Sequence, residues 1–115
     1  MQVKAKAKNL HETPRKLMLV AKSINGMQAT YARDWLKTAN KKAAKTMYKL
    51  LNSAIANATN NHGMTVENLV IASAQVGVSH RRLKRGSYSR THMRFQVRKW
   101  AHAEITLEQK ATNGK

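Results

Sequence analysis

The feature that most constrains the fold of this chain is a long alternation of apolar and polar residues near its C-terminus. From His92 to Glu108, odd positions are apolar apart from Lys99, and even positions are polar apart from Trp100. Such alternation predicts a β-strand, which at about 3.3 Å per residue would be on the order of 55 Å long. A compact domain of about 100 residues has a radius of gyration of only about 13 Å. Either the strand breaks, or it belongs to a β-hairpin that projects well beyond the body.

A second alternating segment supplies a partner for that strand. Residues 69–78 alternate and are rich in Val, Ile and Ala, which predicts a strand. The residues between the two segments, 80–90, contain glycine and serine for turning, several Lys and Arg residues, and no acid. Because a two-stranded ribbon is at best marginally stable alone in water, a surrounding polyanion would stabilise such a hairpin.

The N-terminal half carries the signals of helices. Thr13-Pro14 is a typical helix start, and Asn25-Gly26 is a typical end. The apolar stripe of this first helix would consist of Leu17, Val20, Ala21 and Ile24. A second, short helix from about residue 29 to 38 would bury Ala32, Trp35 and Leu36.

A third and longest helix is predicted to begin after Asn40, its capping residue, and to end at a break over residues 60–63. Its buried stripe would consist of Ala43, Met47, Leu50, Leu51, Ala54, Ile55 and Ala58. Lys42, Lys45 and Lys49 would lie on its other face. We therefore expect one face of the helix in the core and a basic face outside.

Residues 3–9 leave two interpretations open: a strand with three ammonium groups on one face, or a frayed basic arm. Taken together, the patterns predict an α+β fold, in which three helices pack on a small antiparallel sheet and a long β-hairpin projects from the body. The expected division is a body of residues 1–78 and 101–108, a hairpin over 79–100, and a flexible tail over 109–115.

The charge of the chain limits the range of functions that it can have. The 22 Lys and Arg residues against 5 Asp and Glu give a formal net charge of +17, and no acid occurs between Asp34 and Glu67 or between Glu67 and Glu104. Such a chain repels itself and is stabilised by a polyanion. A surface of this kind predicts phosphate binding, with counterion release supplying much of the affinity.

The strongest candidate interface is the hairpin, because arginine binds phosphate through two parallel hydrogen bonds and stacks on bases. Cations in the first turns of a helix oppose its dipole at a cost of roughly 0.3–1 kcal/mol each, a cost that a bound phosphate would reverse. The predicted RNA-binding residues are Lys4, Lys6, Lys8, Arg15, Lys16, Lys41, Lys42, Lys45, Lys49, His80, Arg81, Arg82, Lys84, Arg85, Arg90, Arg94, Arg98 and Lys99.

Other kinds of site find no support in the sequence. There is no Cys, the five His residues lack metal-ligand spacing, and no paired carboxylates, phosphate loop or nucleophile motif is present. We therefore expect no enzymatic activity, cofactor or metal. No apolar run approaches the roughly 20 residues of a membrane span and no signal peptide is apparent, so a cytoplasmic protein is expected. Trp35 is expected in the core, and Trp100 either stacks on a base or packs under a helix, of which packing is favoured.

Three segments resemble the bacterial form of the large-subunit ribosomal protein family numbered twenty-two. They are the first helix with its Thr13-Pro14-Arg15-Lys16 start, the third helix with Lys41-Lys42-Ala43-Ala44 and Ser53 to Ala58, and the basic segment between two long strands followed by His102 to Thr106. The resemblance covers about residues 3–108. Met18 departs from it, since the family usually has a base there.

This resemblance implies a small α+β body on the surface of the large ribosomal subunit, with a hairpin that reaches through ribosomal RNA to line the peptide exit tunnel. The implied partners are large-subunit ribosomal RNA, neighbouring ribosomal proteins, and the nascent polypeptide at the hairpin tip, with no membrane partner and no homo-oligomer. Tip candidates are Arg85, Gly86, Ser87, Tyr88, Ser89 and Arg90. The rival hypotheses are a free-standing nucleic-acid-binding protein and an enzyme acting on RNA.

Overall fold

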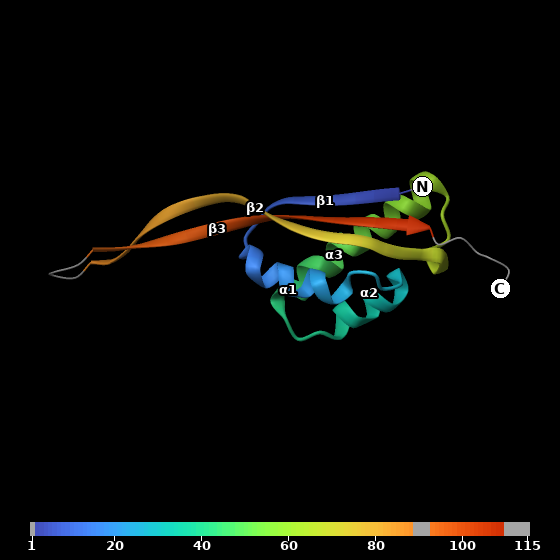
Figure 1. Ribbon diagram of the computed structural model, residues 1–115, viewed down its shortest axis with the longest axis horizontal. Coiled ribbons are helices and arrows are strands. Elements are labelled where there is room, and N and C mark those ends of the chain that lie inside the picture. Colours follow the sequence, from blue (N-terminus) through green and yellow to red (C-terminus); the bar gives the residue numbers. More distant parts are fainter. Residues whose placement is uncertain (1, 89–92, 110–115) are drawn as a thin grey trace.

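The computed structural model describes residues 2–88 and 93–109, and it describes their side chains except for residue 80 and residues 82–98. The chain forms one sheet and one layer of helices (Figure 1). In order, the elements are β1 (Gln2–Leu10), α1 (Pro14–Ile24), α2 (Ala29–Thr38), α3 (Lys42–Ala56), a π-helical turn (Asn57–Asn61), a 3-10 turn (Val66–Asn68), β2 (Leu69–Tyr88) and β3 (Met93–Gln109). The expected α+β class is confirmed.

The sheet is antiparallel, with β3 between β1 and β2. Its register places Ile105 of β3 between Ala5 and Ala74, and Glu104 between Lys6 and Gln75. Ile105 belongs to the core, and its partners Ala5 and Ala74 pack against that core. Residues of α1 and α3 form the other side of the same core. The sheet therefore has a helix-covered face and an open face.

The N-terminal segment is a strand and not a frayed arm, because residues 2–10 form β1 and pair with β3. Val3 is buried, and the alternate lysines of β1 are exposed on the open face. The Asn57 side-chain amide also donates a hydrogen bond to the Lys4 carbonyl at 3.2 Å, which attaches the end of the helical layer to this edge.

Helix α1 begins and ends where the sequence predicts. Thr13 occupies the N-cap position, but its hydroxyl makes no capping hydrogen bond; its carbonyl accepts from the amides of Lys16 and Leu17 at 3.2 and 3.3 Å. Gly26, with φ of +85°, turns the chain after the helix. Its amide donates to the Ile71 carbonyl at 3.0 Å, so the turn is fixed to β2. The predicted apolar stripe of α1 is buried.

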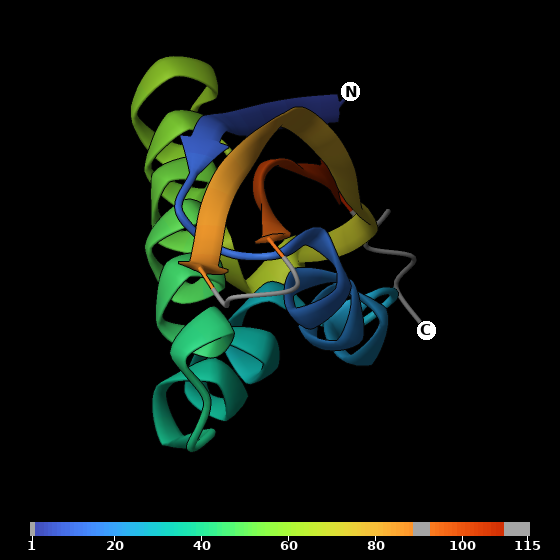
Figure 2. The same ribbon diagram turned by 90° about the vertical axis from the view of Figure 1, so that its left-hand side faces the viewer.

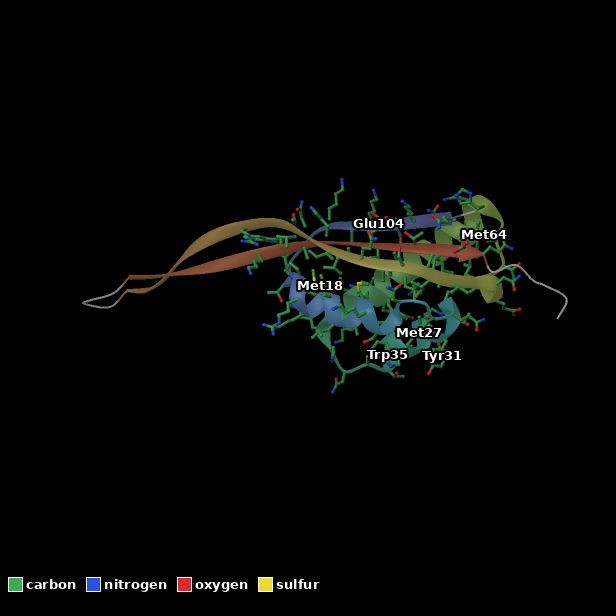
Figure 3. The ribbon with its side chains drawn as sticks, in the orientation of Figure 1. Met18, Met27, Tyr31, Trp35, Met64 and Glu104 are labelled. Atoms are coloured by element: carbon green, nitrogen blue, oxygen red, sulfur yellow. The ribbon has the colours of Figure 1, made fainter. Side chains whose placement is uncertain are left out.

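Two expectations about α2 and α3 need correction. Lys41, not Asn40, is the N-cap of α3, and it provides no side-chain capping bond. Trp35 is only half-buried and packs on the margin of the core, while Ala29, Ala32 and Leu36 are fully buried. In Figure 3, Tyr31 and Trp35 lie on the side of the helical layer away from the sheet. The predicted stripe of α3 is buried in full, together with Ala44.

The long strand does not break. Strands β2 and β3 pair from Leu69↔Gln109 to Tyr88↔Met93, so β2 runs ten residues beyond the expected end at Val78, and β3 includes Gln109, which was expected in the tail. Pairing of β1 stops at Leu10↔Ala101, and beyond it β2 and β3 form a two-stranded ribbon that leaves the body (Figures 1 and 2). The extents of 71 × 25 × 18 Å and the radius of gyration of 17.5 Å agree with a projecting hairpin.

The base of this hairpin is marked by two β-bulges at the same level of β3. Ala101 pairs with both Leu10 and Val78, and each outer strand has an irregularity next to that pair. Bulges increase the local twist of a sheet. Here they coincide with the change from three strands to two.

A polar clasp bridges the two bulges and is formed by Asn9, Ser79 and His102. The Ser79 hydroxyl donates to Asn9 Oδ1 at 2.6 Å, and the backbone N–H of Asn9 donates to His102 Nδ1 at 3.4 Å. Asn9 has φ of +58°, the left-handed region that Asn tolerates better than most residues. The clasp thus joins β1 to β2 across the central strand.

Two substitutions at Asn9 should separate two costs in stability. One is the loss of the hydrogen bond with Ser79, and the other is the strain of a different residue in the left-handed conformation. Asn9→Gly keeps the left-handed conformation and removes the contact with Ser79, so we expect a loss of about 1 kcal/mol in unfolding free energy. Asn9→Ala removes the same contact and adds left-handed strain of about 1 kcal/mol more. Urea unfolding of the two variants checks this order; equal stability would contradict it.

None of the helices within residues 2–88 and 93–109 is long and apolar enough to cross a membrane.

Candidate nucleic-acid interface

The backbone register of the hairpin brings basic residues opposite one another. Arg81 pairs with Lys99, and Arg82 pairs with Arg98 in the next position. The side chains of Arg81 and Lys99 are exposed. Like charges directly opposite each other destabilise an antiparallel pair. The first two pairs beyond the bulge therefore weaken the free hairpin, and an anion between or beside the strands would reverse that effect.

The remaining hairpin candidates are placed by backbone only. The side chains of His80, Arg82, Lys84, Arg85, Arg94 and Arg98 lie outside the described part of the structure. Of the tip candidates, Arg85, Gly86, Ser87 and Tyr88 belong to β2, with a change of register between Arg85 and Tyr88. Ser89 and Arg90 lie outside the described residues. The RNA-binding role of all these residues stays a prediction.

A second group of candidates lies at the end of the body from which the hairpin leaves. Helices α1 and α3 both begin at this end (Figure 1). Neither has an acidic residue in its first turn. The exposed bases around these two helix starts are Arg15, Lys16, Lys41, Lys42 and Lys45. The positive ends of two helix dipoles and five cations thus lie on the side of the body where the hairpin is attached.

Glu12 holds the two helix starts together. Thr46 of α3 donates its hydroxyl hydrogen to Glu12 Oε1 at 2.6 Å, and Oε2 of the same carboxylate is buried without a hydrogen-bond partner. A carboxylate is stabilised near helix N-termini. Glu12 is half-buried between the helix starts, whereas the bases around them are exposed. An anion could therefore reach these bases.

Removing the lysines of α3 should change stability and RNA binding in opposite directions. Lys42 and Lys45 oppose the helix dipole, so Lys42→Ala with Lys45→Ala should raise the unfolding free energy of the free protein by about 0.5–1 kcal/mol at low salt. The same variant should bind RNA more weakly, with a salt slope lower by about two. Lys22→Ala with Lys37→Ala is the matched control, because these lysines lie in the last turns of α1 and α2. Unchanged RNA binding by the α3 variant would contradict the assignment.

Lys4, Lys6 and Lys8 form a third group, on the open face of the sheet. Lys4 Nζ and Lys6 Nζ each lie 3.7 Å from a different carboxylate oxygen of Glu104. The two lysine side chains are exposed and Glu104 is half-buried, so the ion pairs contribute little to stability. Figure 3 shows Glu104 on β3. Lys49 is exposed on α3, one turn beyond Lys45.

Trp100 is buried against the loop that follows β1. Its indole Nε1–H donates to His11 Nδ1 at 3.0 Å, and the two rings meet edge to face with centroids 6.2 Å apart. Trp100 is 9% exposed. Trp100 therefore packs within the protein as favoured, but this contact is with a loop residue and not with a helix.

Sequence reasoning missed the polar residues that organise these surfaces. The contacts of Glu12 with Thr46, His11 with Trp100, and Asn9 with Ser79 join positions 34, 89 and 70 residues apart. No local periodicity signals such pairs. Within the described part of the chain, no group of three His, Asp or Glu side chains is placed to hold a metal ion.

Comparison with known proteins gives a consistent result. The family model for ribosomal protein L22p/L17e matches residues 5–109. The large ribosomal subunit protein uL22 of Solibacter usitatus is 41% identical over 113 residues, which cover 96% of this chain and 98% of that protein. The uL22 proteins of Brucella abortus and Phenylobacterium zucineum are 39% and 44% identical, over 99% and 67% of this chain. The alignments span 88% of the Brucella protein and 61% of the Phenylobacterium protein.

Proposed function

The chain belongs to the ribosomal protein L22p/L17e family, and on this premise we propose that it is a non-catalytic constituent of the large ribosomal subunit. In this proposal it binds large-subunit ribosomal RNA through phosphate and shape contacts and supports assembly of the subunit. Its location is then the ribosome in the cytoplasm, among neighbouring ribosomal proteins. No cofactor takes part.

The observation that carries the RNA-binding part of the proposal is the pairing of bases with bases in the hairpin. The backbone register places Arg81 opposite Lys99 and Arg82 opposite Arg98, and like charges opposite each other disfavour strand pairing. A ribbon with two such pairs, and with no acid from residue 68 to residue 103, gains stability when phosphates surround it. RNA offers phosphates on every side of a protein segment that it encloses.

The basic end of the body supports the same conclusion independently. Its cations surround the N-termini of α1 and α3, where backbone N–H groups favour anions. Because the hairpin leaves from this end (Figure 1), one continuous RNA surface could contact both. We therefore propose that the body, residues 1–78 and 101–108, docks by this end while residues 79–100 extend into the RNA.

The proposal includes the exit tunnel and rests there on family membership. Residues 85–90 would lie at the tunnel wall and contact the nascent polypeptide. The length of the ribbon supports this, because β2 and β3 pair as far as Tyr88↔Met93, well away from the helical layer.

Sedimentation tests the ribosomal assignment. A lysate is washed with high salt and run through a density gradient, and the chain is located by mass spectrometry. We expect it in stoichiometric amount with the large subunit. Recovery at the top of the gradient, free or bound to DNA, would overturn the proposal in favour of a free-standing nucleic-acid-binding protein.

A further inference from the structure

We propose that the open face of the sheet holds a binding site for a single unpaired nucleotide of RNA. The site is a shallow depression with a volume of about 320 Å³, whose lining includes Lys6, Lys8, Gln75, Gly77, His102 and Glu104 together with three apolar residues. It lies on the face opposite the helical layer, and the hairpin candidates are not part of it. This inference rests on the proposed function, which supplies RNA as the source of the nucleotide.

The floor of the depression is open because of Gly77. This residue pairs with His102, and a Cβ added to it would meet no heavy atom within 4 Å. Its φ lies outside the left-handed region, so the backbone does not require glycine here. The missing side chain leaves a flat area beside the imidazole of His102, which suits a planar base.

The side chains around this floor combine donors and acceptors in the way that a base edge requires. The backbone N–H of Asn9 donates to His102 Nδ1, so Nε2 is the ring nitrogen that a base edge could contact. Gln75 offers a carbonyl oxygen and an amide, and Glu104 offers carboxylate oxygens. A carboxylate accepts hydrogen bonds from exocyclic amino groups and repels bare phosphate. Glu104 therefore favours a base over an inorganic anion.

The lysines of β1 provide for the phosphates of the same nucleotide and its neighbours. Lys4, Lys6 and Lys8 alternate along β1, so all three lie on the open face, and Lys6 and Lys8 line the depression. Lys4 Nζ and Lys6 Nζ each lie 3.7 Å from a carboxylate oxygen of Glu104, close to the base position. A nucleotide within an RNA strand should consequently bind more tightly than a free mononucleotide, because adjacent phosphates reach more lysines.

The test is a titration of the full chain, followed by its backbone amide NMR signals at low salt. The probes are the four ribonucleoside 5′-monophosphates, a short single-stranded RNA containing the preferred base, ribose 5-phosphate and inorganic phosphate. We expect one nucleotide to shift the signals of Gly77, Gln75 and His102 and to bind at least tenfold more tightly than ribose 5-phosphate. The short RNA should bind more tightly still.

Substitution of Gly77 makes the assignment specific. Gly77→Trp fills the floor and should weaken nucleotide binding at least tenfold, whereas Gly77→Ala should retain it within twofold. Most of the salt slope for ribosomal RNA should come from the hairpin and the helix starts, so it should change little in both variants. Equal affinity for nucleotides and ribose 5-phosphate, or wild-type nucleotide binding by Gly77→Trp, would overturn the site. Tighter binding of the mononucleotide than of the RNA would overturn the RNA source. A failure of the proposed function would instead appear as an RNA salt slope that does not depend on the hairpin.

Discussion

Replacing Arg81, Arg82, Lys84 and Arg85 with alanine should produce the largest loss of RNA binding of any substitution in this chain. Each lost phosphate contact lowers the slope of log affinity against log salt by about one. We therefore expect the slope for large-subunit ribosomal RNA to fall by roughly three to four. Filter binding or fluorescence anisotropy between low and physiological salt measures it directly.

The same variant should fold at least as well as the wild type. Alanine at positions 81 and 82 removes two repulsive cross-strand pairs, Arg81↔Lys99 and Arg82↔Arg98. A charge-matched control replaces Lys22, Lys37, Lys110 and Lys115, four bases outside the predicted interface, with alanine. That control should change the salt slope by clearly less. Equal slopes for the two variants would show that total charge, and not the hairpin, determines binding.

Ile105→Ala should cause the largest loss of stability. Ile105 is fully buried in the central strand, and its cross-strand neighbours on both sides are the small residues Ala5 and Ala74. Because these neighbours are short and held by the sheet, they cannot fill the space that the side chain leaves. The expected cost is about 3–5 kcal/mol, at the upper end for the removal of a buried Ile side chain.

Such a loss is a large part of the roughly 5–15 kcal/mol by which domains are stable. Urea unfolding of the free protein measures it. Glu108→Ala is the control, since it lies on the same strand with an exposed side chain and should change stability by less than about 0.5 kcal/mol. A cost below about 1 kcal/mol for Ile105→Ala would mean that the core can collapse around the position.

Local patterns in the sequence were sufficient to predict the regular elements. The stripe of α3 is correct because side chains that recur every three or four residues must share a helix face. The alternation around Ile105 is correct because successive strand residues point to opposite faces. The length of the hairpin followed from the same count, since a strand that long cannot fit within a compact body.

What could not be predicted depends on contacts between distant residues. Asn40 resembles a cap, but the helix begins one residue later, at a lysine N-cap. The clasp at Asn9 requires two bulges to lie side by side across β3, which no single segment reveals. The ion pairs of Glu104 could not be predicted either, because its two lysine partners come from β1 and the pairing follows only from the register of the sheet.

The measurement that tests the central claim most directly is the mapping of protein–RNA cross-links in purified large subunits. Salt-washed subunits are irradiated, and the peptides of this chain that carry ribonucleotides are identified by mass spectrometry. We predict that cross-links concentrate on residues 79–100 and on the starts of α1 and α3, while α2 carries few. Cross-links confined to α2 and the rest of the helical surface, with none on the hairpin, would contradict the account.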